Sequence, residues 1–151
     1  MIFGNHAMPK KLRVFLDTSA ILAGLNSPNG AAGIILAACF VHEAIPVISP
    51  QVVEEAERVI AQKFPRLFAG WIIFLLIPPQ IASPPTLAQV RKAYRVLPTN
   101  DAPILAAALN TRPDALVTWN TRDFMRPAVV EASPFPILRP GEFLRLLQRG
   151  N

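Results

Sequence analysis

The hydrophobic and polar positions form two kinds of segment that alternate along the chain. Four short apolar segments, rich in β-branched or aromatic residues, are typical of buried strands. They are residues 13–17, 46–49, 115–118 and 137–138. Longer segments with helical spacing or an opening proline are typical of helices. They are residues 31–41, 50–63, 87–95, 99–109 and 141–148. Strands that alternate with helices predict an α/β sandwich with a parallel sheet.

The remaining segments connect these elements. The apolar run WIIFLLI, residues 71–77, fits either a helix or a strand, and the proline-rich segment 78–85 is a connection. The chain has no internal repeat and no linker long enough to separate two domains. We therefore expect one domain over residues 13–148, preceded by an irregular leader at residues 1–12.

Composition narrows the class of protein. Of the 151 residues, 52% are hydrophobic and 17% are charged, as in a globular protein and unlike a disordered one. The 15 Lys and Arg outnumber the 10 Asp and Glu, which mildly favours polyanionic partners. Cys39 is the only cysteine, so an intrachain disulfide is excluded and a reducing, cytoplasmic location is expected.

Neither secretion nor membrane insertion is indicated. Residues 1–11 lack the long apolar segment and the small-residue cleavage site of a signal peptide. The most apolar run, residues 71–77, is far shorter than the ~20 residues that span a bilayer. We therefore expect this run to lie in the core and the protein to have no membrane partner.

Acidic residues stand where the predicted strands and helices meet. Asp17 ends the first strand, and Asn120 and Asp123 follow the third. Asp101 opens a nearly apolar helix, and the helix after the second strand carries three glutamates. Because ligands of open α/β sheets bind beyond the carboxyl ends of the strands, we expect these acids to meet at one edge of the sheet.

Each acid also has a purely structural interpretation. Asp17 could cap the turn that follows it, and the charge of Asp101 suits the N-terminus of a helix. The glutamates could form a solvated helix face, and Asp123 could be a loop residue. Taken singly, these interpretations are at least as good as a functional one. The shared placement of the four positions is what favours a site.

Helical phase separates the three glutamates of the helix at residues 50–63. Its apolar face is formed by Val52, Val53, Ala56, Val59 and Ile60. Glu54 points about 160° from the centre of that face, whereas Glu55 and Glu57 each lie about 100° from it, on opposite edges. Glu55 is nearer to the end of the preceding strand and is the better candidate for a site there.

Carboxylates that share a cleft repel one another unless a cation holds them together. Carboxylate oxygens suit Mg²⁺ or Mn²⁺, and two histidines and one cysteine give no evident zinc site. Such cations often act on phosphates, where they activate water and stabilise charge on a phosphodiester. The chain has neither GxxxxGK[ST] nor GxSxG, which argues against a P-loop NTPase and a serine hydrolase.

Four segments together resemble the PIN-domain ribonucleases, in particular their bacterial toxin-like (VapC-like) branch. They are LDTSAIL, ISPQVVEEAERVI, TNDAPILAAAL and LVTWNTRDF, in this order, within a resemblance that covers residues 13–147. The resemblance implies a three-layer α/β/α sandwich with a central parallel sheet. It also implies an endoribonuclease that uses Mg²⁺ or Mn²⁺ to cleave RNA.

Carried over residue by residue, the resemblance implies roles for three acids. Asp17 is the first metal-binding and catalytic acid, and Thr18 or Ser19 supports it. Glu55 matches the family's helix-borne glutamate, in agreement with the helical phase. Asp101 matches the metal-binding acid that opens the central helix.

The fourth acidic position is open. Many relatives carry an acid where this chain has Asn120, and others use the aspartate of the RDF segment, here Asp123. We favour Asp123 as the catalytic and metal-binding residue, because only it carries charge. Thr118 matches a small hydroxyl residue that faces the site. Arg122 and Arg126 could hold the RNA backbone or could simply lie in a solvated loop.

The resemblance further implies a homodimer and a protein antitoxin that covers the site, although the residues themselves show neither. Two other functions stay open. Asn120 leaves room for a catalytically inactive PIN-like module that binds RNA or assembles with other proteins. A haloacid-dehalogenase-like phosphatase would need DxDx[TV], but Ser19 stands where the second acid should be.

Overall fold

The computed structural model describes residues 10–150, so most of the leader predicted for residues 1–12 lies outside the described residues. Five parallel strands form one sheet in the order β3-β2-β1-β4-β5. The strands are β1 (Arg13–Leu16), β2 (Ile45–Ile48), β3 (Gln80–Ile81), β4 (Ala115–Val117) and β5 (Ile137–Leu138). The parallel sheet confirms the predicted fold class.

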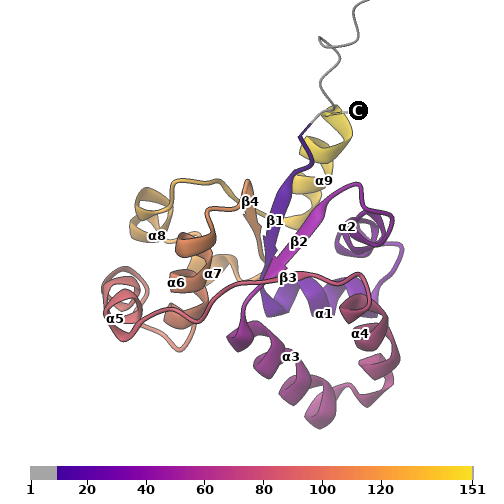
Figure 1. The fold of residues 1–151 in the computed structure, drawn as a ribbon, viewed down its shortest axis with the longest axis horizontal. Helices are drawn as coiled ribbons and strands as arrows, with labels where there is room; N and C mark the ends of the chain where they lie inside the picture. Colours follow the sequence, from indigo (N-terminus) through magenta and orange to yellow (C-terminus); the bar gives the residue numbers. More distant parts are fainter. Residues whose placement is uncertain (1–9, 151) are drawn as a thin grey trace, which may run out of the picture.

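Helices cover both faces of this sheet, and α5, α6 and α8 lie on the side opposite to α1, α2 and α4 (Figure 1). α9 packs against α2 and against β4 and β5. The helices are α1 (Thr18–Asn26), α2 (Ala31–Phe40), α3 (Pro50–Lys63), α4 (Phe68–Leu75), α5 (Leu87–Val96), α6 (Ala102–Thr111), α7 (Thr121–Phe124), α8 (Pro127–Ala132) and α9 (Pro140–Arg149). A 3₁₀ turn, η1 (Pro65–Leu67), precedes α4.

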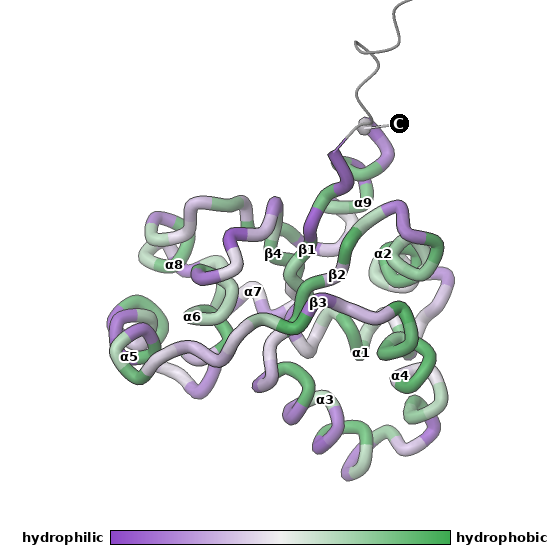
Figure 2. The backbone as a smooth tube through the Cα atoms, in the orientation of Figure 1, coloured by the Kyte–Doolittle hydropathy of each residue, from purple (hydrophilic) through white to green (hydrophobic). Residues whose placement is uncertain are grey.

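The central strands are apolar because helices cover them on both faces. Val14 and Phe15 of β1 and Leu116 and Val117 of β4 are fully buried, and Figure 2 shows hydrophobic colouring along the sheet. Cys39 of α2 is also fully buried, and burial raises the pKa of its thiol to about 12. Cys39 is therefore a small core residue.

Three differences from the sequence-based expectations concern local structure. Residues 18–26, for which we predicted no element, form α1 directly after β1. The connection at residues 78–85 contributes β3, the short edge strand. Residues 121–132 hold the short helices α7 and α8, which are too short to show helical periodicity in the sequence.

The apolar run at residues 71–77 belongs mostly to α4, and the expectation that it lies in the core is only half right. Trp71 and Phe74 are buried and stack with ring centroids 5.7 Å apart. Ile73 and Leu76, in contrast, are exposed by 52% and 71%. A helix can turn only one side towards the core, so the other side of this apolar helix faces outward.

Within the described residues, no single helix is long and apolar enough to cross a membrane. α1 and α2 taken together pass a test of length and composition, but they are bent by 95° relative to each other.

Candidate active site

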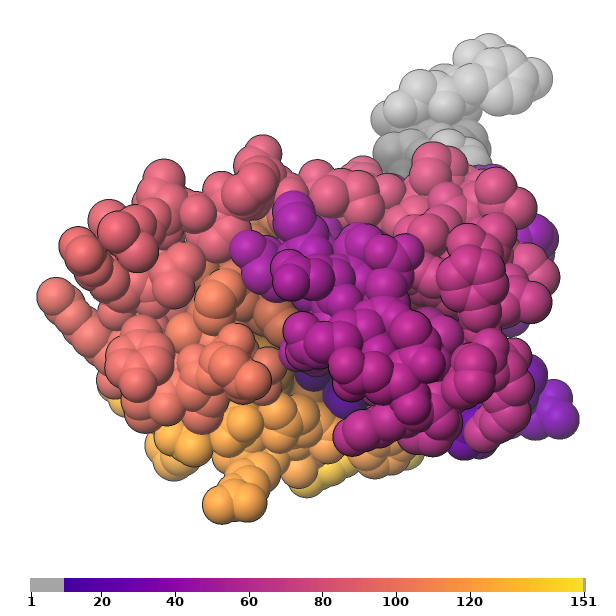
Figure 3. All heavy atoms as spheres, turned by 90° about the horizontal axis from the view of Figure 1, so that it is seen from below, coloured from indigo at the N-terminus to yellow at the C-terminus, as the bar shows by residue number. Residues whose placement is uncertain are grey.

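Buried polar residues gather at one edge of the sheet. Among residues 10–150, the buried polar or charged ones are Asp17, Thr18, Ser49 and Thr118. Asp17, Ser49 and Thr118 directly follow β1, β2 and β4, and Thr18 comes next after Asp17. Because burying polar groups is costly without partners, their concentration at this edge indicates a built polar site. Figure 3 views this edge and shows a hollow between α3 (magenta) and α6 (orange).

Asp17 is both the cap of α1 and a buried carboxylate. Its Oδ1 accepts hydrogen bonds from the backbone N–H of Ala20 (3.1 Å) and from the hydroxyl of Ser19 (2.7 Å). Its Oδ2 accepts a bond from the hydroxyl of Thr118 (2.7 Å). Burial raises the pKa of Asp17 to about 6, although these three bonds oppose the shift; the nearby charge of Asp101 adds a smaller increase.

The two hydroxyl residues after Asp17 behave differently. Ser19 bonds the carboxylate of Asp17 and also accepts the backbone N–H of Trp119 (2.9 Å). Thr18 is buried, yet its hydroxyl has no hydrogen-bond partner in the described part of the chain. Of the two residues that the sequence left open as support for Asp17, Ser19 is the one that contacts it.

Asp101 stands at the N-terminus of α6 but does not cap it. Its side chain makes no capping hydrogen bond, and its Oδ2 instead accepts a bond from the amide of Asn120 (2.9 Å). The pKa of Asp101 is raised by burial first, then by the charges of Glu55 and Asp123, while the bond from Asn120 opposes the rise. These effects show that its carboxylate lies among the other acids.

The amide of Asn120 lies between two carboxylates. The same Nδ2 that bonds Asp101 also donates to Oδ2 of Asp123 (3.2 Å). The other oxygen of Asp123 pairs with Arg126 (3.1 Å). Both oxygens of Asp123 therefore have partners. Arg126, for which the sequence left an RNA contact and a solvated loop open, pairs with this acid.

α3 carries Glu55 towards the acids, as its helical phase predicts. Glu55 is half-buried and close enough to Asp101 to raise its pKa, whereas Glu54 is exposed. Glu57, on the opposite edge of the apolar face, accepts a hydrogen bond from the indole of Trp71 (3.1 Å). The three neighbouring glutamates thus have three different surroundings.

Thr118 joins the two halves of the site. Its hydroxyl donates to Asp17 and accepts the backbone N–H of Asn120 (2.8 Å). A continuous chain of hydrogen bonds therefore runs from Asp17 through Thr118 to the loop that holds Asn120 and Asp123.

We did not predict a role for Trp119 in this loop, although an aromatic residue between two site residues was visible in the segment TWN. Arg122, also in this loop, is exposed.

The donors at this edge suit a hard divalent cation. They are carboxylate and hydroxyl oxygens, the ligands that Mg²⁺ and Mn²⁺ prefer. Within residues 10–150, no three His, Cys, Asp or Glu side chains stand together as a complete metal-binding group. Mg²⁺ commonly binds through one or two carboxylates and keeps several waters, so the donor set fits such an ion without a complete protein shell.

Comparisons with known proteins agree with this architecture. The family profile described as "PIN domain" matches residues 13–122, a range that ends just before Asp123. PAE2754 from Pyrobaculum aerophilum has a similar structure, with a TM-score of 0.62, 15% identity, and coverage of 94% of this chain and 99% of that chain. VapBC2 from Rickettsia felis, solved bound to a DNA fragment from its promoter, gives a TM-score of 0.59, 19% identity, and coverage of 85% and 98%. At these identities the two structures support the fold alone. No curated protein matches the sequence significantly.

Asp17→Asn should stabilise the cation-free protein at neutral pH. In the folded protein the pKa of Asp17 is about 6, against an ordinary value of 3.8. Below about pH 4 the carboxyl of Asp17 is neutral in both the folded and the unfolded protein, and its burial carries no charge penalty. As the pH rises from there through about 6 the folded protein must ionise this buried group, and its free energy of unfolding falls by roughly 3 kcal/mol at most. Melting curves in EDTA should nearly coincide at pH 4, while at pH 7 the variant should melt roughly 5–10 °C higher. A variant that melts lower at pH 7 would refute a buried-charge penalty at Asp17.

Proposed function

The chain belongs to the PIN-domain family, and from this premise we propose that it is a Mg²⁺- or Mn²⁺-dependent endoribonuclease, the toxin of a toxin–antitoxin pair. Members of this family are generally nucleases. The observation that carries the proposal is the hydrogen-bond network that gathers acids from separate parts of the chain at one edge of the sheet. Asn120 donates to both Asp101 and Asp123. Thr118, which donates to Asp17, also accepts the backbone N–H of Asn120.

In this proposal Asp17, Asp101 and Asp123 hold the cation, and Asn120 supports Asp101 and Asp123 through its amide. A bound divalent cation would activate water and stabilise the negative charge that develops on a phosphodiester. Asp17 is suited to a fixed position, because three hydrogen bonds orient its two oxygens. Glu55 is half-buried and accepts no hydrogen bond from the described residues, so its carboxylate oxygens are available to orient the attacking water and accept its proton.

The substrate we propose is RNA, held through its phosphates. The chain carries a net charge of +5, and Arg122 is exposed in the loop beside the acids. Arg126 is partly occupied by its ion pair with Asp123. Arg122 is therefore the better candidate for a direct contact with the RNA backbone.

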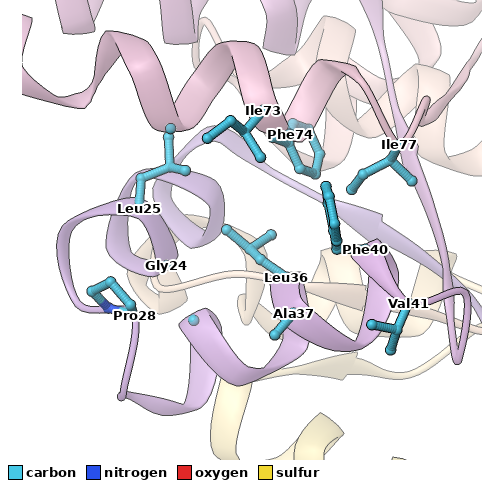
Figure 4. Close-up of a pocket in the computed structure, with 12 residues that line it drawn as sticks. Gly24, Leu25, Pro28, Leu36, Ala37, Phe40, Val41, Ile73, Phe74 and Ile77 are labelled. Atoms are coloured by element: carbon cyan, nitrogen blue, oxygen red, sulfur yellow. The ribbon is translucent and has the colours of Figure 1, made fainter.

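We also propose an antitoxin and a second copy of the chain as protein partners. α2 and α4 expose large apolar side chains such as Phe40 (52%) and Ile73 (52%), and so does Leu76 (71%) just after α4, as protein interaction surfaces do. Phe40 and Ile73 line an apolar pocket of about 460 Å³ between α1, α2 and α4 (Figure 4). This surface offers a partner protein a place to bury apolar side chains.

A second candidate function rests on Asn120. Its amide already neutralises part of the repulsion between Asp101 and Asp123 by donating to both. A chain whose acids are stabilised in this way could keep the fold as a catalytically inactive module that binds RNA. The cleavage assay below separates the two functions.

Purified protein should cleave single-stranded RNA in the presence of Mn²⁺ or Mg²⁺, and Asp17→Asn should abolish the cleavage. The substitution keeps the shape and most hydrogen bonds of the side chain but removes the charge that the cation needs. EDTA should abolish the wild-type activity, and added Mn²⁺ should restore it. Full activity in EDTA, or undiminished cleavage by the variant, would refute the proposed function.

Glu55→Gln should reduce the cleavage rate far more than Glu54→Gln does, by about 100-fold or more if Glu55 acts as a general base. The two residues are neighbours on α3 with the same chemistry, but only Glu55 faces Asp101. Glu54→Gln is therefore a matched control for the loss of one negative charge. Equal losses from the two substitutions would contradict a specific role for Glu55.

Asn120→Asp should tighten Mn²⁺ binding roughly tenfold or more, because it adds a negative charge beside Asp101. It should also lower the Tm of the protein in EDTA, since it replaces a donor to two carboxylates by a third carboxylate. Calorimetric titration with Mn²⁺ measures the first effect. Asn110→Asp, at an exposed position of α6, controls for net charge. Equal Mn²⁺ affinity in the two variants would place Asn120 outside the metal site.

A further inference from the structure

Trp119 exposes a large aromatic side chain in the loop that carries the acidic site. It lies between Thr118 and Asn120, whose side chains bond the acids of the site. Its exposed fraction is 49%, whereas Trp71, the other tryptophan of the chain, is fully buried. The proposed cleavage mechanism gives Trp119 no role.

The backbone of Trp119 is held in place on both sides. Its N–H donates to the hydroxyl of Ser19 (2.9 Å), and the same hydroxyl donates to Asp17 (2.7 Å). The flanking residues are tied to each other by the bond from the N–H of Asn120 to the hydroxyl of Thr118 (2.8 Å). A loop that is already ordered in the free protein has little conformational entropy left to lose when a ligand binds.

The face of an indole ring binds another flat aromatic group by stacking. Unpaired nucleobases offer such a face, whatever their sequence, while the bases of a duplex are already stacked on one another. Single exposed apolar residues are common on proteins and need no function. Trp119 differs from them because its backbone is hydrogen-bonded to the serine that holds Asp17.

We propose that Trp119 is a stacking platform for an unpaired nucleobase, next to the phosphodiester that the acids would act on. This inference rests on the proposed nuclease function and adds to it a residue that recognises an unpaired base of the substrate. The substrate is single-stranded at the position that contacts Trp119, and the platform itself gives little preference for one base over another.

The test measures binding of a fluorescein-labelled single-stranded oligoribonucleotide, by anisotropy, to protein carrying Asp17→Asn so that no cleavage occurs. Adding Trp119→Leu should weaken the Kd by about 5- to 150-fold. Adding Trp119→Phe should retain most of the affinity, because phenylalanine also stacks. Tyr94→Leu, which removes an aromatic side chain of α5 that is exposed by 55%, should leave the Kd unchanged. Wild-type protein in EDTA provides a second background without the substitution at position 17.

Tryptophan emission gives an independent readout with unlabelled RNA. Because Trp71 is buried, acrylamide should quench mainly Trp119, and bound single-stranded RNA should protect it. A duplex of the same sequence should protect it much less. Unchanged affinity in Trp119→Leu, or unprotected emission, would overturn the platform alone. If neither background binds RNA at all, both the stacking platform and the proposed nuclease function fail. If binding depends on Trp119 but the wild type cleaves no RNA, the platform stands and the nuclease function fails.

Discussion

A carboxylate withdrawn from water at the end of the central strand is the constraint on which the rest of the site depends. Asp17 is 4% exposed, and an ionised carboxylate in such a place needs donors or a cation. The donor that follows the neighbouring strand β4, Thr118, reaches it because β1 and β4 pair with Leu16 opposite Val117. The N–H of Asp17 also donates to the carbonyl of Val117 (3.3 Å). The register of two buried strands therefore fixes the first acid and its hydroxyl partner together.

Helices, not strands, place the other acids. Glu55 reaches the edge of the sheet through the phase of α3, whose buried face is set by Val52, Ala56 and Ile60. Asp101 reaches it because α6 packs a nearly continuous run of small and aliphatic residues into the core and begins at this edge. The free protein tolerates this approach of like charges partly because the amide of Asn120, which is neutral, donates to two of them. An amide can lower the repulsion between carboxylates without adding a charge that would compete with a cation.

Features that depend on buried apolar patterns could be predicted from the sequence. Apolar runs predict the strands at residues 13–16 and 115–117, and an opening proline with helical spacing predicts the helix at residues 50–63. The same helical spacing predicts that Glu55 is more buried than Glu54. Features that depend on hydrogen-bond partners far apart in the chain could not. The sequence left Thr18 and Ser19 as equals, and only the fold shows that the hydroxyl of Ser19 meets Asp17. The exposed side of α4 was missed for a related reason, because an apolar run alone does not say whether one side or both sides are covered.

The apolar surface and the acidic site use separate residues. None of the twelve residues that line the pocket between α1, α2 and α4 is one of the acids or belongs to the loop at residues 118–126. The core requires only one side of α4, which Trp71 and Phe74 supply. The exposed Ile73 of α4, and Leu76 just after it, therefore contribute little to the stability of the single chain. Apolar side chains on an outer face also promote non-specific association, which makes them unfavourable in the absence of a partner. A partner protein that covered this face would bury these apolar side chains, just as the cation that we propose would offset the repulsion between the carboxylates at the edge of the sheet.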